Sequence, residues 1–181
     1  MKKLAAIAVV FMAVLMAACG NQDKDNTGKE QNAEPEFADI ITNIKEQVAK
    51  DMEVENVNDL NQYYQEVNLT EREDGDSASD IWVEKMKVNP ELLANGTVLA
   101  ALMNVNADEI IVLEAKDEDQ VDELKSSLEN ELAAQDQTWK QYLPEQYEKV
   151  KNNKIVTKGK FLLYVTYTNP EEIEKTFNES F

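Results

Sequence analysis

The stretch from Asp117 to Tyr142 limits the fold most narrowly, because its pattern predicts one long amphipathic helix. Asp117 and Gln120 are spaced as a capping box, and acidic side chains fill the first turn, where the helix dipole favours them. Pro144 disfavours a helical conformation at Leu143. The apolar residues that share one face at helical spacing are Val121, Leu124, Leu128, Leu132, Trp139 and Tyr142. We therefore predict a helix over residues 117–142 that is long enough to cross a whole sheet.

Two apolar runs before this helix predict a pair of strands. Residues 97–105 and 110–113 lie on either side of the polar turn Asn106-Ala107-Asp108, an arrangement typical of antiparallel strands. The Ala, Leu and Met content of the first run leaves a helix as the competing prediction for that run.

The segment after the long helix predicts a hairpin and a last helix. Residues 155–157 and 161–167 flank Lys158-Gly159, where glycine can supply the positive φ of a tight turn. Asn169 and Pro170 then resemble the start of a helix, with a capping box and proline at the first helical position.

The part of the chain before the strands is predicted to be helical. Residues 36–50 carry one apolar stripe, residues 60–67 suggest a second short helix, and residues 70–80 form a polar loop. The order is therefore N-terminal helices followed by β-β-α-β-β-α. This order predicts an α+β fold, in which an antiparallel sheet of about four strands carries its helices on one face.

The first eighteen residues have the composition of a secretion signal. Lys2 and Lys3 precede an apolar run over residues 4–16, and Ala17 and Ala18 follow it. The run is shorter than the roughly 20 apolar residues that span a bilayer. An uncleaved anchor helix is the alternative interpretation.

The lone cysteine of the chain, Cys19, comes directly after these small residues. The sequence around it resembles the lipobox of bacterial lipoproteins, although Met16 stands where leucine is usual. The resemblance implies that Cys19 becomes a lipidated N-terminus; an ordinary buried cysteine is the alternative. We expect a signal peptide over residues 1–18, a lipidated cysteine with a polar, acidic tether over residues 19–36, and a single α+β domain over residues 37–181.

Composition excludes several functional classes. The chain has no histidine and one cysteine, which excludes Ser-His-Asp and Cys-His catalysis, His-ligated metals and disulfides. Removal of residues 1–18 takes away two lysines and no acid, which changes the net charge from −18 to −20. Such a surface repels nucleic acid and favours cationic partners or divalent ions. We expect no cofactor and no nucleic-acid partner.

Acidic residues provide two candidate sites. Asp74, Asp76 and Asp80 faintly resemble a calcium loop, but the ligand, glycine and glutamate positions of an EF-hand are not filled. A solvated acidic loop explains these residues better than a calcium site, and a weak, irregular cation site is the alternative. Asp108 and Glu109 open a predicted strand, and the acids at 117–119 open the long helix. A pair drawn from these two groups could serve as glycosidase-type acid and base. Turn formation and helix capping account for the same residues without catalysis.

Aromatic residues provide a third candidate site near the end of the long helix. Trp139, Tyr142 and Tyr147 could form a rim for a peptide or a glycan. Burial in the core is the alternative for all of them, and Trp139 fits the buried stripe.

Three segments resemble a family of small bacterial lipoproteins known only as domain of unknown function 4358, found mainly in Gram-positive bacteria. They are NADEIIVLEAKDEDQVDELKSSLE at 106–129, YLPEQ at 142–146 and VTKGKFLLYVT at 156–166. The likeness covers about residues 80–180. It implies a cell-surface lipoprotein and brings no activity, cofactor or functional residue.

The sequence leaves three functional hypotheses. The first is a non-enzymatic module, lipid-anchored outside the cytoplasmic membrane through Cys19, that binds an unknown protein, peptide or envelope ligand. The second is an acidic surface protein that binds divalent cations. The third is a carboxylate-dependent hydrolase.

Overall fold

The computed structural model describes residues 34–71 and 77–181, so the expected signal peptide, Cys19, and most of the tether lie outside the described residues. The described chain is an α+β domain, as the sequence predicts. Its strands are β1 (Tyr64–Asn68), β2 (Leu93–Ala101), β3 (Glu109–Ala115), β4 (Lys154–Lys158) and β5 (Phe161–Thr166). Its α-helices are α1 (Phe37–Asp51), α2 (Ser77–Met86), α3 (Val121–Tyr142), α4 (Pro144–Lys151) and α5 (Pro170–Glu179).

Within the described residues, five antiparallel strands form one open sheet in the order β1-β2-β3-β5-β4. The prediction of about four strands missed β1, which lies where a short second helix was expected. Val57–Gln62 instead form a 3-10 helix, and the chain then enters the sheet. Tyr64 and Val67 are both buried, on opposite faces of the strand, because an edge strand offers a packed surface to either side.

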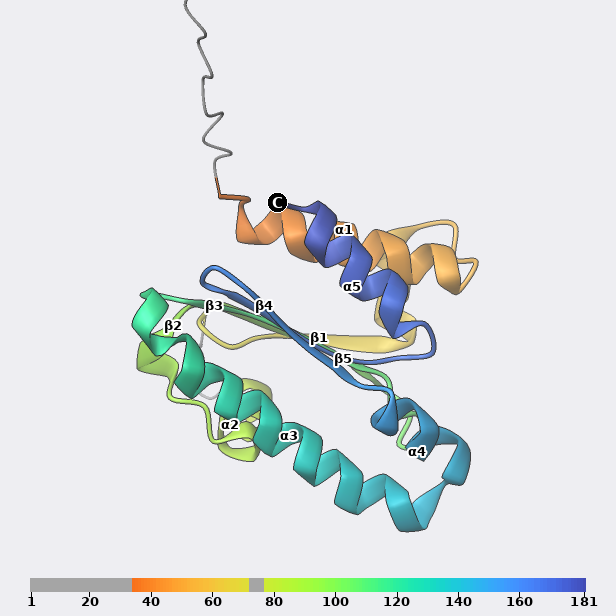
Figure 1. Cartoon of the computed structure of the whole chain (residues 1–181). Helices are drawn as coiled ribbons and strands as arrows, with labels where there is room; N and C mark the ends of the chain where they lie inside the picture. Colours follow the sequence, from red (N-terminus) through yellow and green to blue (C-terminus); the bar gives the residue numbers. More distant parts are fainter. Residues whose placement is uncertain (1–33, 72–76) are drawn as a thin grey trace, which may run out of the picture. The chain divides into compact units, whose positions relative to one another are not determined.

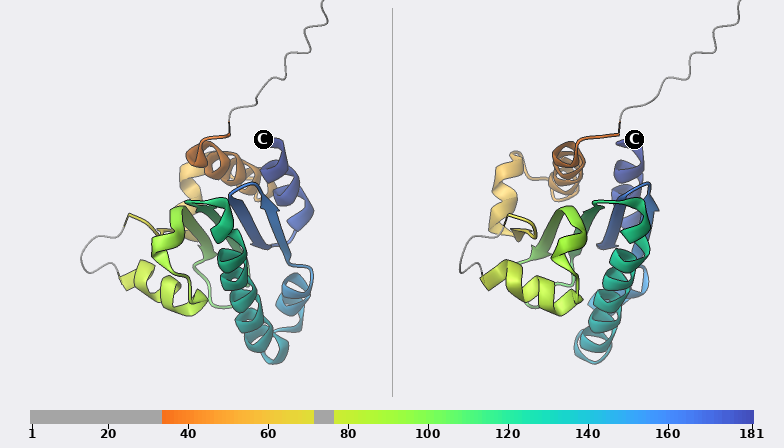
Figure 2. Two further views of the ribbon diagram at one scale, coloured as in Figure 1. Left: turned by 60° about the vertical axis from the view of Figure 1, so that its left-hand side comes forward. Right: turned by 90° about the vertical axis from the view of Figure 1, so that its left-hand side faces the viewer.

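Helices cover both faces of the sheet, which corrects the prediction of one covered face. Figure 1 shows α1 and α5 above the sheet and α2 and α3 below it, and two further views in Figure 2 agree. The physical reason lies in β3 and β5. Their apolar runs do not alternate with polar residues, and nearly every side chain in them is buried. A strand that buries both of its faces needs a layer on each side.

Each face of the sheet therefore has its own hydrophobic core. On one face, Ile44 of α1 and Phe177 of α5 pack against Ile110, Val112 and their neighbours. On the other, residues of α2 and α3 pack against the alternate side chains of the same strands. The buried residues of α3 are Leu124, Ser127, Leu128, Glu131, Gln135 and Trp139. The buried stripe thus contains polar side chains, and these form the candidate site.

Strand β2 ends earlier than the predicted run of 97–105. Its pairing with β3 finishes where Ala100 lies opposite Glu109. The remaining apolar residues of the run leave the sheet and are exposed in the β2–β3 loop, residues 102–108; they are Leu102, Met103 and Val105. The competing prediction of a helix for this run is wrong, because the run pairs with strands on both sides.

The predicted helix boundaries are largely confirmed. The capping box of Asp117 and Gln120 is present, and one 3-10 turn leads into α3. The helix ends at Tyr142, and Pro144 opens a separate helix, α4, that was not predicted. Pro170 is the first residue of α5, but the Asn169 side chain makes no capping hydrogen bond.

The hairpin between β4 and β5 depends on Gly159. Its φ is +55°, and a Cβ added there would meet nothing within 4 Å. A Gly159→Ala substitution therefore introduces backbone strain without a clash, and we expect it to lower the free energy of unfolding by about 1 kcal/mol. Gly159→Asn is the matched control and should cost less, because asparagine tolerates positive φ. Urea unfolding of the three proteins measures the difference; equal stability of the alanine variant and the parent would contradict it.

Candidate functional site

The candidate site lies at the end of the sheet where β3 begins. Glu109 is the first residue of this strand and is only 3% exposed. Its side chain lies on the face covered by α2 and α3, between Ala100 of β2 and Thr166 of β5. A buried carboxylate is costly unless hydrogen bonds or an opposite charge compensate it, so its neighbours determine what the site can do.

Two donors are shared between Glu109 and a second buried carboxylate, Glu131 of α3. The ammonium Nζ of Lys85 lies 2.7 Å from Glu131 Oε1 and 3.4 Å from Glu109 Oε2. The amide Nε2 of Gln135 donates to Glu109 Oε2 at 2.8 Å and to Glu131 Oε1 at 3.0 Å. We call Lys85, Glu109, Glu131 and Gln135 the carboxylate cluster. Its two carboxylates face each other across the same two donors.

The cluster is not fully compensated. Oε1 of Glu109 and Oε2 of Glu131 are buried and have no hydrogen-bond partner among the described residues. Two carboxylates also stand against one ammonium. Burial, and then the charge of Glu131, raise the pKa of Glu109 from its usual range to about 8, while Lys85 acts in the opposite direction. Glu109 therefore remains largely protonated at neutral pH.

Two tryptophans fix the donors of the cluster. Trp139 Nε1 donates a hydrogen bond to Gln135 Oε1, which leaves the amide nitrogen of Gln135 free to face the carboxylates. Lys85 Nζ lies 4.1 Å from the centre of the Trp82 ring, a cation–π contact. Both rings are buried. Helices α2 and α3 thus hold the cluster through side chains that also belong to the core.

A second polar network surrounds Asp108, whose side chain is directed away from the carboxylate cluster. Tyr64 Oη donates to Asp108 Oδ2 at 2.9 Å, and Lys149 Nζ lies 2.6 Å from Oδ1. Asn106 adds a hydrogen bond to Oδ2 at 3.1 Å. Burial, and then the charge of Asp108, raise the pKa of Tyr64 far above its usual range, so the phenol stays protonated and remains a donor. This network ties β1 and α4 to the β2–β3 loop.

A surface pocket of about 170 Å³ opens beside the carboxylate cluster. We call it the Glu109 pocket. Its lining comes from β1, α2, β2, the β2–β3 loop, β3 and α3: Gln65, Trp82, Lys85, Ala100, Ala101, Met103, Asn104, Asn106, Ala107, Asp108, Glu109, Gln135 and Trp139. The pocket combines aromatic walls, amide groups and one buried carboxylate with an unpartnered oxygen. Such convergent polar groups on an apolar wall are typical of ligand sites.

The predicted aromatic rim is only partly assembled. Trp139 is buried and lines the Glu109 pocket, whereas Tyr142 is 54% exposed. Their ring centres are 5.8 Å apart. Tyr147 donates through its hydroxyl to Asp136 Oδ1 at 2.8 Å, and this hydrogen bond raises the pKa of the phenol. Tyr142 and Tyr147 do not line the pocket, so the three rings do not form one rim.

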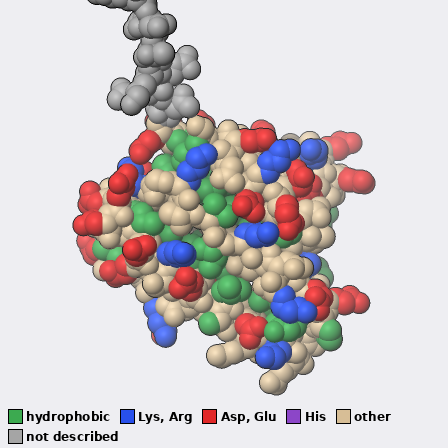
Figure 3. Space-filling model, viewed as in Figure 1, with side chains coloured by type: hydrophobic (Ala, Val, Ile, Leu, Met, Phe, Trp, Pro, Cys, Tyr) green, Lys and Arg blue, Asp and Glu red, His purple; other side chains and the backbone are tan. Residues whose placement is uncertain are grey.

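The predicted pair of catalytic acids is not assembled, and the predicted calcium loop lies mostly outside the described residues. Asp74 and Asp76 lie outside them, and Asp80 is exposed in the first turn of α2. All of β3 separates Asp108 and Glu109 from the acids at 117–119, so these groups do not converge. Within residues 34–71 and 77–181, no three Asp, Glu, His or Cys side chains gather closely enough to hold a metal ion. Figure 3 shows acidic and basic side chains interspersed over one face.

A larger groove of about 800 Å³ lies between α1 and the other face of the sheet. Its carboxylates are Glu34, Glu36, Glu66, Glu71 and Glu114. Three of these already have a cation nearby, since Glu66 lies 2.6 Å from Lys45, and Glu34 and Glu114 lie 3.4 and 3.6 Å from Lys160. The groove contains no buried unpartnered carboxylate oxygen among the described residues. We therefore place the candidate site at the Glu109 pocket.

Sequence reasoning missed Lys85, Glu131 and Gln135. One signal was present, because Glu131, Gln135 and Trp139 are each four residues apart and therefore lie on one helix face. Trp139 belongs to the buried stripe, so Glu131 and Gln135, which precede it on the same helix face, should also be buried. The contribution of Lys85 depends on its contact with Glu109, which is 24 residues away in the sequence, and no local sequence pattern predicts such a contact.

The comparisons with known proteins identify one family. A family model described as a domain of unknown function, DUF4358, matches residues 65–167, more than half of the chain. No curated protein and no solved structure matches the chain. The match begins in β1, ends after β5, and includes every residue of the carboxylate cluster. The chain therefore belongs to the DUF4358 family.

Proposed function

We propose that this protein is a non-enzymatic binding module, lipid-anchored at the outer side of the cytoplasmic membrane, and that the Glu109 pocket is its binding site. The observation that carries the proposal is the pocket itself, where a buried carboxylate oxygen without a donor meets aromatic walls. Buried polar atoms in proteins nearly always have a hydrogen-bond partner, and a donor group of a ligand would supply the missing one.

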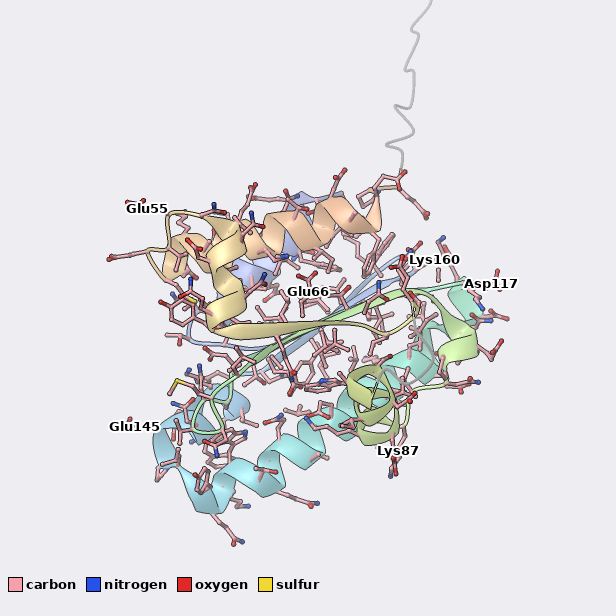
Figure 4. All side chains as sticks on the ribbon, turned by 180° about the vertical axis from the view of Figure 1, so that it is seen from behind. Glu55, Glu66, Lys87, Asp117, Glu145 and Lys160 are labelled. Carbon is pink, nitrogen blue, oxygen red and sulfur yellow. The ribbon has the colours of Figure 1, made fainter. Side chains whose placement is uncertain are left out.

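The pocket lies at the end of the sheet opposite to the end where the described chain begins. The described chain begins at Glu34, which lies 3.4 Å from Lys160, near the C-terminal end of β3. The pocket lies at the N-terminal end of the same strand. Seven residues of strand separate the two ends by roughly 20 Å. In Figure 4, Lys160 and Asp117 lie at one end of the sheet and Glu145 at the other.

Exposed apolar side chains next to the pocket favour a macromolecular ligand. Leu102, Met103 and Val105 project from the β2–β3 loop, and each is at least 40% exposed. Tyr63, also exposed, is held beside them because its carbonyl accepts a hydrogen bond from the Leu102 amide at 2.8 Å. A group of large apolar side chains exposed together is typical of a binding surface.

The arrangement of the carboxylates favours binding over hydrolysis. Retaining glycosidases hold their two carboxyl groups about 5 Å apart with the sugar between them, and inverting enzymes hold them about 6.5–9.5 Å apart. In the carboxylate cluster, both carboxylates contact the same two donors, Lys85 and Gln135. Glu131 is fully buried and does not line the Glu109 pocket, so a substrate in the pocket meets only one of the two carboxylates. Among the described residues, no helix has the length and apolar character needed to cross a bilayer.

The anchor has a direct test. A Cys19→Ala variant lacks the sulfur that would carry the lipid, so we expect it to move from the membrane fraction to the soluble fraction of cells. Mass spectrometry of the parent protein should find acyl chains on Cys19 and no residues before it. Retention of the variant in the membrane fraction would contradict the anchor.

The binding surface has a separate test. A photo-crosslinking residue at Met103 in intact cells should give a discrete adduct, because Met103 lies at the edge of the Glu109 pocket. The control position is Glu172, which is exposed in α5, on the opposite face of the sheet. Adducts at both positions or at neither would contradict a specific surface at the β2–β3 loop.

A further inference from the structure

We propose that the Glu109 pocket binds a primary ammonium or guanidinium group, whose positive charge pairs with the buried Glu109 carboxylate. The inference rests on the proposed binding function and adds the chemical class of the ligand. Four observations carry it: unpartnered acceptors, the charge of the cluster, the aromatic walls and the exposed apolar rim.

Two carboxylate oxygens of the cluster lack a hydrogen-bond donor among the described residues. Its four carboxylate oxygens face two donors, and both donors contact Glu109 Oε2 and Glu131 Oε1. Glu109 Oε1 and Glu131 Oε2 are left without partners. Glu109 lines the pocket, and a rotation of its side chain would bring Oε1, which is buried in the free protein, to a ligand N–H there. A ligand that brings only acceptors would worsen the imbalance.

The cluster also lacks one positive charge. The charged and titratable groups around Glu109 are Lys85 of α2, Glu131 of α3 and Tyr164 of β5. The nearby cation Lys149 is occupied by Asp108 at 2.6 Å. When Glu109 loses its proton, two negatively charged carboxylates lie beside a single ammonium group. A monovalent organic cation restores neutrality without a metal ion.

The walls of the pocket suit an organic cation. Trp82 already supports an ammonium, since Lys85 Nζ lies 4.1 Å from its ring centre. Trp139 provides a second aromatic edge, and a volume of about 170 Å³ accommodates a cationic head with a short alkyl stem. Met103 at the rim is exposed and can contact an apolar neighbour of the cation. A lysine or arginine side chain in an apolar protein segment has these properties together.

Competition between ligand and proton gives the proposal a signature. Each bound cation displaces one proton, which passes to the buffer, as long as the pair is protonated in the free protein. Because the pKa of Glu109 is about 8, binding at pH 7 should release about one proton per ligand. Affinity should rise about tenfold per pH unit up to roughly pH 8 and then level off. An alkyl ammonium remains charged throughout, since its pKa is near 10.4.

The experiment is a titration of the full chain with n-butylammonium and ethylguanidinium, with n-butanol as the neutral control. The indole N–H resonances of the two tryptophans report binding, since both rings line the pocket. Calorimetry in buffers of different ionisation enthalpy counts the released protons. We expect both cations to bind, n-butanol not to bind, and the affinities for the cations to increase with pH as above.

Three glutamate-to-glutamine variants locate the site. Glu109→Gln and Glu131→Gln each remove one of the two negative charges, and both should weaken n-butylammonium binding at pH 8 at least tenfold and abolish its pH dependence. Glu66→Gln, on the other face of the sheet, should bind as the parent does. Equal binding by all four proteins, or cation binding without proton release, would overturn the proposal. If the first two variants failed to fold, the pH dependence and proton count of the parent would still decide.

A second experiment distinguishes a cationic side chain of a protein segment from a free amine. N-acetyl-leucyl-lysine amide carries the same ammonium beside an apolar side chain. Tighter binding of this peptide than of n-butylammonium, lost in Met103→Ser, identifies a protein segment as the ligand; equal affinity identifies a free amine. Failure of both cations would overturn the ligand class alone, since crosslinking at Met103 and the Cys19 variant test the binding module and its anchor separately.

Discussion

Replacing Phe177 with alanine is expected to lower the free energy of unfolding by about 3–5 kcal/mol. Phe177 is fully buried in α5 and belongs to the core between this helix, α1 and the sheet. Its ring also contacts Phe181, with ring centres 5.3 Å apart in an edge-to-face arrangement. The substitution removes the buried ring and leaves a cavity between α1, α5 and the sheet, which cannot move together far enough to fill it.

Phe181→Ala is the matched control. Phe181 makes the same ring contact and a second one to Phe161 at 5.2 Å, but it is only partly buried. Loss of its ring therefore removes less apolar area from the core, and the expected cost is smaller than for Phe177. Urea unfolding followed by circular dichroism measures both. A cost for Phe177→Ala no larger than that for Phe181→Ala would contradict the packing of α5 described here.

Helices α1 and α5 lie outside the residues that the family model matches. The match begins at residue 65 and ends at residue 167. Without these helices, Ile110, Val112 and Leu163 would lose the layer that buries them. The two helices therefore complete the fold of the matched region. They do not contribute side chains to the Glu109 pocket.

Local signals in the sequence predicted local structure well. The capping box at Asp117 and the proline at 144 set the two ends of the α3 region, and Gly159 marked the hairpin. Each of these features depends on contacts within a few residues of sequence. The α+β class followed from their order along the chain.

The prediction failed where distant segments decide the structure. Residues 60–68 carry a spacing that suits a helix, but pairing with β2 draws their second half into the sheet. The single covered face was a misreading of β3 and β5, whose unbroken apolar runs require helices on both sides. Glu131 and Gln135 lay visibly on a buried stripe, yet their partners Lys85 and Glu109 come from other elements. The anchor residue Cys19 lies outside the described residues.

The stability of the folded protein should fall as the pH rises through the range in which Glu109 loses its proton. In the unfolded chain this carboxyl ionises near its usual value of 4.5, whereas the pKa in the folded protein is about 8. Between these values the folded state binds more protons than the unfolded state. The free energy of unfolding therefore decreases with pH over this window and levels off above it. At about 1.4 kcal/mol per pKa unit, the contribution amounts to several kcal/mol.

Glu109→Gln isolates this contribution from that of the other acids. Glutamine resembles the protonated carboxyl, so the variant should match the parent within about 1 kcal/mol at pH 5. At pH 8.5 it should be more stable by several kcal/mol, because only the parent must then bury a second negative charge. Urea unfolding at intervals from pH 5 to 9 measures the difference, with Glu66→Gln as the control. If the stability difference between Glu109→Gln and the parent did not change with pH, Glu109 would not hold a proton in this pH range. The proposed competition between that proton and an organic cation would then have no basis.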